Sequence, residues 1–193
     1  MTEPNKSPSQ EERFILSLQK LTDDKNGKKP DRAALAALRR GLGKTPGEAS
    51  EMHRYVVPFT SKLTDQVIDN YYLVASLFAL HQISWTKIEQ RYSNLGASFF
   101  ELKDSSDSIE KRFVALLNCR QEDLSDHLRH AVSLLKSKEI GIDWLQLLKD
   151  LDHWNSDKRF VQRNWASAFW SNTSNESSDS STTEHQPENQ SQN

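Results

Sequence analysis

The sequence predicts an all-α protein: two small helical bundles packed together, followed by a disordered serine-rich C-terminal tail. Three observations support this fold class. Between residues 9 and 170, most stretches repeat their large apolar side chains every three or four residues, which is the period of an amphipathic helix. No stretch shows the sustained alternation of apolar and polar residues that a half-buried strand shows. Residues typical of helix starts also precede several of the periodic stretches.

Four helices are predicted in the first half of the chain. The first begins at a capping box, in which Ser9 and Glu12 are three residues apart. The third is short and is expected to stop at Pro58, because proline has no N–H to continue a helix. The fourth is apolar nearly all round, which places it at the centre of a bundle. Their predicted bounds are 9–21, 31–40, 51–57 and 64–80.

The second half begins after a connector, residues 81–92, and a short helix over residues 93–102. The polar run DSSDS, residues 104–108, is the best candidate for a boundary between the two bundles. Four more helices follow: one from Ile109, one over residues 124–135, one capped by Asp143 and one that starts near Ser156. The predicted divisions of the chain are 1–8 (disordered), 9–104 (first bundle), 105–170 (second bundle) and 171–193 (disordered tail).

Composition limits the environment of the protein. The tail has four acidic residues and no large apolar side chain, so it cannot bury enough surface to fold. Without the tail, 25 basic residues face 23 acidic ones, and the near-neutral total hides a slightly basic body. One cysteine, a polar N-terminus and no apolar run of membrane-spanning length predict a soluble cytoplasmic protein with no membrane partner.

The stretch GLGKT, residues 41–45, resembles a phosphate-binding loop but does not fit one. Such a loop needs a glycine five positions before the glycine of Gly-Lys-Thr, and here that position is Leu38. The stretch also follows a predicted helix, whereas a phosphate loop follows a strand. Gly41 is better explained as the residue after a helix C-terminus.

No pattern in the chain indicates catalysis. There is no nucleophile turn and no dinucleotide fingerprint, so neither enzyme activity nor a cofactor is expected. His127 and His130 could face one way on a helix, but a zinc site needs further ligands and the chain has a single cysteine. We therefore interpret this pair as part of a solvated polar face and predict no metal site.

Basic residues carry the clearest functional signal. Residues 20–44 hold eight bases and three acids. In the second half, several arginines have few acidic neighbours, and Arg159 and Arg163 are spaced to share a helix face. Arginine suits phosphate contact because its guanidinium forms paired hydrogen bonds. The tryptophans at positions 144, 154, 165 and 170, by contrast, are expected in the core or in a subunit interface.

Several stretches, taken in order, resemble a known family. They are LAALRRG, MHRYVVPF, YYLVASLFALH, NLGASFFEL, SIEKRFVALLNC, LRHAVSLLKSK and IDWLQLLKDLDHW. Together they are similar to CasB, the small subunit of the type I-E CRISPR surveillance complex called Cascade, over residues 9–170. The resemblance implies two helical bundles and a role without catalysis. It also implies as partners the large and backbone subunits of Cascade, a second copy of the chain, CRISPR RNA and target DNA.

The resemblance further implies a positive surface that faces the guide–target duplex and the displaced DNA strand. The matching positions are Arg39, Arg40, Arg54, Lys111, Arg112, Arg120 and Arg129. Exchanging a DNA duplex for an RNA–DNA hybrid is nearly balanced in free energy, so backbone contacts can stabilise the R-loop. One alternative of another class stays open: a helical adaptor that binds only protein and uses these bases as rim charges.

Overall fold

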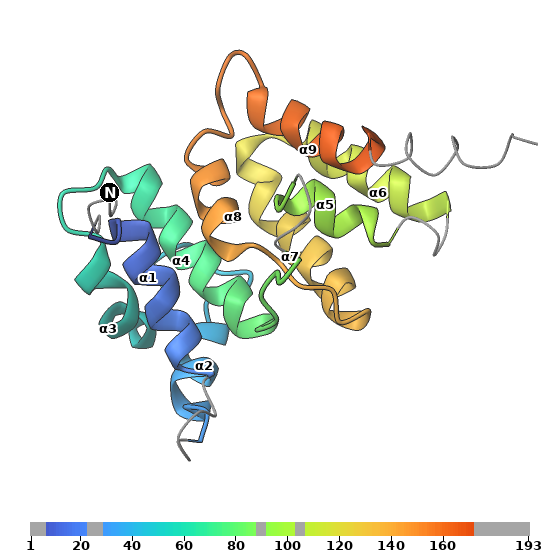
Figure 1. Ribbon diagram of the computed structural model, residues 1–193. Coiled ribbons are helices and arrows are strands. Elements are labelled where there is room, and N and C mark those ends of the chain that lie inside the picture. The colour runs from blue at the N-terminus through green and yellow to red at the C-terminus, as the bar shows by residue number, and fades with distance from the viewer. Residues whose placement is uncertain (1–6, 23–28, 88–91, 103–106, 172–193) are drawn as a thin grey trace, which may run out of the picture.

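The computed structural model describes residues 7–22, 29–87, 92–102 and 107–171, and this part of the chain is helical with no strands (Figure 1). Its helices in chain order are α1 (Gln10–Lys20), α2 (Arg32–Arg39), α3 (His53–Val56), α4 (Asp65–Leu80), α5 (Leu95–Phe100), α6 (Asp107–Asn118), α7 (Gln121–Ser137), α8 (Trp144–Leu151) and α9 (Phe160–Trp170). Two 3-10 turns, Ser50–Met52 and Val57–Phe59, flank α3. The all-α prediction is confirmed.

Local capping explains where several helices begin. At α1 the predicted capping box is present: the Ser9 Oγ accepts from the Glu12 N–H at 3.2 Å, and the Glu12 carboxylate accepts from the Ser9 N–H at 2.8 Å. The Asp143 carboxylate accepts from the Gln146 N–H at 2.9 Å, as the sequence predicted for α8. These side chains satisfy backbone donors that the first helical turn leaves free.

Two predicted helix bounds were wrong. The α-helical part of the third element ends at Val56, and Pro58 lies inside the 3-10 turn that follows instead of ending the helix. The last helix begins at Phe160 and not near Ser156, because Arg159 adopts a left-handed conformation with φ of 47° that an α-helix cannot continue.

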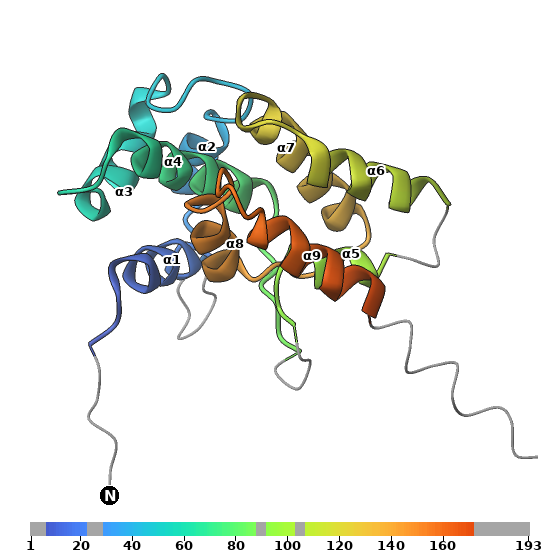
Figure 2. The same ribbon diagram turned by 90° about the horizontal axis from the view of Figure 1, so that it is seen from above.

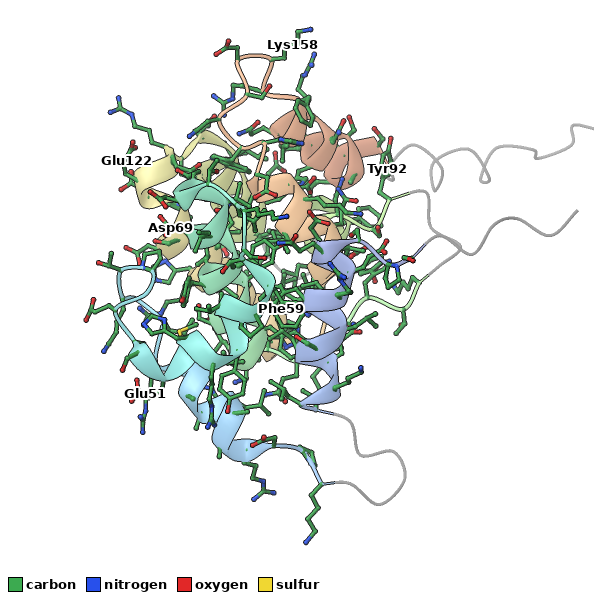
Figure 3. All side chains as sticks on the ribbon, turned by 90° about the vertical axis from the view of Figure 1, so that its left-hand side faces the viewer. Glu51, Phe59, Asp69, Tyr92, Glu122 and Lys158 are labelled. Carbon is green, nitrogen blue, oxygen red and sulfur yellow. The ribbon has the colours of Figure 1, made fainter. Side chains whose placement is uncertain are left out.

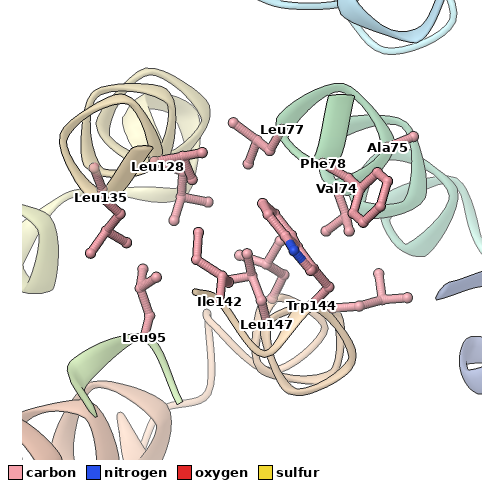
Figure 4. Packing of buried hydrophobic residues seen from close by; sticks show 14 of the residues in the cluster. Val74, Ala75, Leu77, Phe78, Leu95, Leu128, Leu135, Ile142, Trp144 and Leu147 are labelled. Atoms are coloured by element: carbon pink, nitrogen blue, oxygen red, sulfur yellow. The ribbon is translucent and has the colours of Figure 1, made fainter. Parts of the chain in front are cut away.

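Helix α4 lies at the centre of the fold, as its apolar sequence predicted. It packs against α2, α3, α7 and α8, and its residues from Asn70 to Ala79 are buried apart from Leu73. Figure 4 shows Trp144 of α8 beside Phe78 and Val74 of α4, and the ring centroids of Trp144 and Phe78 are 5.5 Å apart. Trp144, Trp154 and Trp165 are all buried, which confirms the prediction for these three side chains.

The helices form two groups with α8 between them. In Figure 1, α1 to α4 lie on one side, and α5, α6, α7 and α9 lie on the other. Figure 2, a view from above, shows the same separation, with α8 next to α1 and α4. Yet the buried hydrophobic residues form one continuous cluster through both groups. Helix α8 packs against α1 and α4 of the first group, and its Asp150 carboxylate accepts from the Trp165 indole N–H of α9 in the second at 2.6 Å.

Helix α5 reaches across the chain to pack against α9. Gly96 makes this approach possible, because a Cβ at that position would lie 2.0 Å from the Trp165 carbonyl oxygen. The connector before α5 is held by a bridge between Ser84 and Ile142, with hydrogen bonds of 3.0 and 3.1 Å. These contacts join segments that lie on either side of residue 104 in the sequence.

The predicted division into two bundles at residues 104 and 105 stays a prediction, since residues 103–106 lie outside the described part. The same holds for residues 1–6 and for the tail beyond Ser171. No helix in the described ranges combines the length and the apolar character needed to cross a membrane.

Replacing Gly96 by alanine is expected to lower the free energy of unfolding by about 1–3 kcal/mol, the usual cost of overpacking a core. The new methyl group would meet the Trp165 backbone, which cannot move without shifting α9. Gly41→Ala is the matched control, because there a Cβ comes closest to the flexible end of the Met52 side chain. Urea denaturation of both variants measures the difference. Equal losses in the two proteins would contradict the close approach of α5 and α9.

Candidate nucleic-acid interface

The seven predicted basic residues are all exposed and come from four helices and their ends. Arg39 and Arg40 lie at the end of α2, and Arg54 lies on α3. The others are Lys111 and Arg112 on α6, Arg120 at the residue before α7, and Arg129 on α7. Their contacts within the chain differ, and these contacts decide which of them are free to meet phosphate.

Arg39 has a partner inside the fold. Its Nε and Nη2 donate to the Ala79 carbonyl oxygen at 3.2 and 2.8 Å. Ala79 is in the last turn of α4, where carbonyl groups have no partner within the helix and carry partial negative charge. The guanidinium therefore caps the central helix, with two of its five donors used. Sequence reasoning missed this role, because the two residues are 40 positions apart.

Arg40 forms an ion pair with Glu51, which belongs to the 3-10 turn before α3. The pKa of the Glu51 carboxyl is lowered by a backbone hydrogen bond and by the hydrogen bond from Arg40. Both side chains are exposed, and such surface pairs contribute little to stability. A phosphate can therefore compete with Glu51 for Arg40.

Arg54 folds back over its neighbour Tyr55. The guanidinium carbon lies 4.5 Å from the ring centroid, and Nη2 donates to the Tyr55 hydroxyl group. The ring fixes the position of the cation by a cation–π contact and leaves the outer face of the guanidinium toward solvent.

Arg129 contacts the loop after α2, residues 41–47, which Figure 2 shows reaching toward α7. A Cβ at Gly43 would lie 2.9 Å from the Arg129 Nη1, and Gly43 has a φ of +72° that favours glycine. Lys44 in the same loop lies 3.7 Å from Glu48. The structure thus brings together the rejected phosphate-loop stretch and one of the predicted bases of the second half.

Arg112 lies beside His127 and His130, and all three line a cavity of about 210 Å³ between α5, α6 and α7. His130 is exposed and His127 is half-buried, so the pair is only in part the solvated face that the sequence suggested. Within the described residues, no three His, Cys, Asp or Glu side chains are grouped to hold a metal ion.

The four basic residues of the second half share one property. Among the described residues, no carboxylate lies within 4.0 Å of the charged groups of Lys111, Arg112, Arg120 or Arg129. The prediction that Arg159 and Arg163 share a helix face was wrong, because Arg159 precedes α9 in a left-handed conformation. Its Nη2 donates instead to the Leu117 carbonyl oxygen at the end of α6.

Arg39→Ala is expected to destabilise the protein by about 1 kcal/mol, because the Ala79 carbonyl oxygen loses its charged donor and keeps only the Gln82 side-chain amide at 3.3 Å. Arg40→Ala, next to it in sequence, should change stability by less than about 0.5 kcal/mol, because its pair is exposed. Thermal or urea unfolding of the two variants tests the distinction. If Arg39→Ala is as stable as Arg40→Ala, then Arg39 does not cap α4.

Three comparisons with known proteins are consistent with one another. Residues 34–170 match the family model described as CRISPR-associated protein Cse2. A Cse2 protein of Thermus thermophilus is 37% identical over 165 residues, which covers 82% of this chain and 89% of that protein.

Solved structures show the same similarity. CasB from M. ruber is 31% identical, with a TM-score of 0.73, and the match covers 91% of this chain and all of the other (100%). CasB from Thermus thermophilus is 37% identical, with a TM-score of 0.68 over 85% of this chain and 99% of the other. A chain in a structure titled CRISPR RNA-guided surveillance complex is 27% identical, with a TM-score of 0.68 over 86% and 94% of the two chains. The chain belongs to the CRISPR-associated Cse2 family, whose solved members include proteins named CasB.

Proposed function

We propose that this chain is a non-catalytic small subunit of a type I-E CRISPR surveillance complex, active in the cytoplasm in antiviral defence. In this role it binds the backbone of the displaced DNA strand and of the guide–target duplex, and thereby stabilises the R-loop. Its partners are the large and backbone subunits, a second copy of the chain, CRISPR RNA and target DNA. Family membership and the surveillance-complex structure among the similar chains support this assembly.

The single observation that carries nucleic-acid binding is the set of exposed bases on α6 and α7 that have no carboxylate partner within the described residues. A basic side chain that already pairs with a carboxylate must give up this partner before it contacts phosphate, whereas these side chains need not. Arg40 and Arg54, at the end of α2 and on α3, would contact phosphate at a second place on the surface. Arg39 has three donors left for phosphate, but two of its donors hold α4.

Contacts of this kind are independent of base sequence and sensitive to salt, because each neutralised phosphate releases counterions. The modest positive charge of the body predicts weak binding by the isolated chain. Assembly into a complex compensates for this weak binding, since it places the basic side chains beside the nucleic acid at a high effective concentration.

Reversing Lys111, Arg112 and Arg129 to glutamate is expected to weaken R-loop formation by the assembled complex at least tenfold. In the isolated chain, the slope of log K against log salt for single-stranded DNA should become shallower by about 0.7 for each phosphate that is no longer neutralised. R-loop formation is measured by gel mobility, and DNA binding by fluorescence anisotropy over a salt series. Lys158→Glu provides the control for a single charge reversal, because Lys158 is exposed in the turn before α9 (Figure 3). It is compared with each of the three reversals made singly, which change the charge by the same amount.

Normal assembly with unchanged R-loop formation in the triple variant would contradict the proposal. A salt slope near zero for the unmodified chain would contradict it as well. That result would favour the alternative, an adaptor that binds protein alone.

A further inference from the structure

The cavity between α5, α6 and α7 is lined by three side chains that carry N–H groups: Arg112 of α6, and His127 and His130 of α7. The rest of its lining is apolar and consists of Phe99, Ala115, Leu116, Ala131 and Leu134. Its volume of about 210 Å³ is below the roughly 300–1,000 Å³ of sites for cofactors and drug-sized ligands. The cavity therefore suits a smaller group, such as a single phosphate.

The fold makes no use of the nitrogen atoms of these three side chains. Within the described ranges, none of the three makes a hydrogen bond or an ion pair with another residue. The other described histidines each have a partner: the Tyr72 hydroxyl group for His53, the Ile140 carbonyl oxygen for His81 and the Phe160 ring for His153. The donors of Arg112, His127 and His130 are thus free for a ligand.

The surroundings of the cavity favour an anion. No carboxylate lines it, and α5 has no charged residue. Glu101, which follows α5, is paired with Lys87. The charged residues that neighbour the three side chains along α6 and α7 are Glu110, Lys111, Asp123, Asp126 and Arg129. Among the described residues, no carboxylate lies within 4.0 Å of either imidazole or of the Arg112 guanidinium. A phosphate that enters the cavity therefore displaces no internal anion.

The chemistry of the three side chains matches a backbone phosphate. A guanidinium forms paired hydrogen bonds with phosphate oxygens. A neutral imidazole donates one N–H, and a protonated one donates two and carries a positive charge. Histidine is the side chain that ordinarily changes its charge between pH 5 and 8. Protonation of both rings would therefore add two positive charges beside Arg112.

We propose that Arg112, His127 and His130 form a pocket for one phosphate of the displaced DNA strand, and that this pocket binds more tightly in mild acid because both imidazoles become cationic. A single strand is flexible enough to turn one phosphate into a recess between helices. The inference rests on the proposed function and adds to it two histidines and a dependence on pH.

The test is binding of a thymidine 20-mer by the full chain at about pH 5.5 and about pH 8, at equal ionic strength. Thymine does not titrate over this range, so a change in affinity reports on the protein. Fluorescence anisotropy with a pH-insensitive dye measures the Kd. Binding should be about fivefold tighter at the lower pH, the effect of two exposed charge contacts. The slope of log K against log salt should also become steeper there by up to about 1.4, or about 0.7 for each added charge.

The double variant His127→Gln, His130→Gln keeps hydrogen-bonding side chains that cannot take up a proton. Its pH response should fall below twofold. His153→Gln is the matched control, because His153 is exposed and lies outside the cavity, and this variant should keep the fivefold response. Thermal melting at both pH values confirms that the variants are folded. NMR of the unmodified, isotope-labelled chain provides a test without substitutions: the ring signals of His127 and His130 should shift on addition of the 20-mer, and those of His153 should not.

Four results would overturn the inference: equal binding at both pH values, a pH response that persists in the double variant, unshifted ring signals of the two histidines, or a response seen with a uridine 20-mer and absent with the thymidine one. Salt-dependent binding of the thymidine 20-mer in any of these cases leaves the proposed function standing. No DNA binding at either pH contradicts both.

Discussion

The arrangement of the two helix groups depends on the polar contacts of α8 and the residues that follow it. The Asp150 carboxylate, 7% exposed, accepts from the Trp165 indole N–H at 2.6 Å and from the Gln146 side chain at 2.8 Å. Two residues later, Asp152 accepts from Asn70 of α4 at 2.8 Å. Burial raises the pKa of Asp150, so the indole and amide donors are needed to hold this charge away from water. The same short segment thus orients α9 on one side and α4 on the other, and with them the surfaces that both proposals use.

Much of the fold could be predicted from the sequence, because helix periodicity and capping are local. Ser9 and Asp143 cap helices through residues three positions away, and such contacts leave a visible spacing. The start of α9 was missed because the left-handed turn at Arg159 has no glycine or asparagine to mark it. The packing of α5 on α9 was not predicted either, since no pattern within α5 says which distant helix Gly96 meets.

The candidate site could be predicted only as a set of charges. The resemblance to the CasB family pointed to seven basic residues, and all seven are exposed. It could not show that Arg39 donates to Ala79, or that Arg40 pairs with Glu51, because these partners are 40 and 11 residues away. Free energy for binding phosphate depends on such partners as much as on the charge itself. In the folded chain these basic residues therefore differ: Arg39 holds the end of α4, Arg40 is paired with Glu51, and those of the second half have no carboxylate partner among the described residues. Only the last group could bind phosphate without first breaking a contact within the chain.

The contact between Gly43 and Arg129 has a consequence for how this chain can vary. A side chain at position 43 would occupy the space of the guanidinium and would also strain a backbone with a φ of +72°. The Arg129 guanidinium is the end of a flexible, exposed side chain and can move aside, so the main obstacle to replacing Gly43 is its backbone conformation. The two positions are neighbours in space although they lie 86 residues apart in the chain by their numbering. A substitution at Gly43 should therefore be costly whichever side chain stands at position 129.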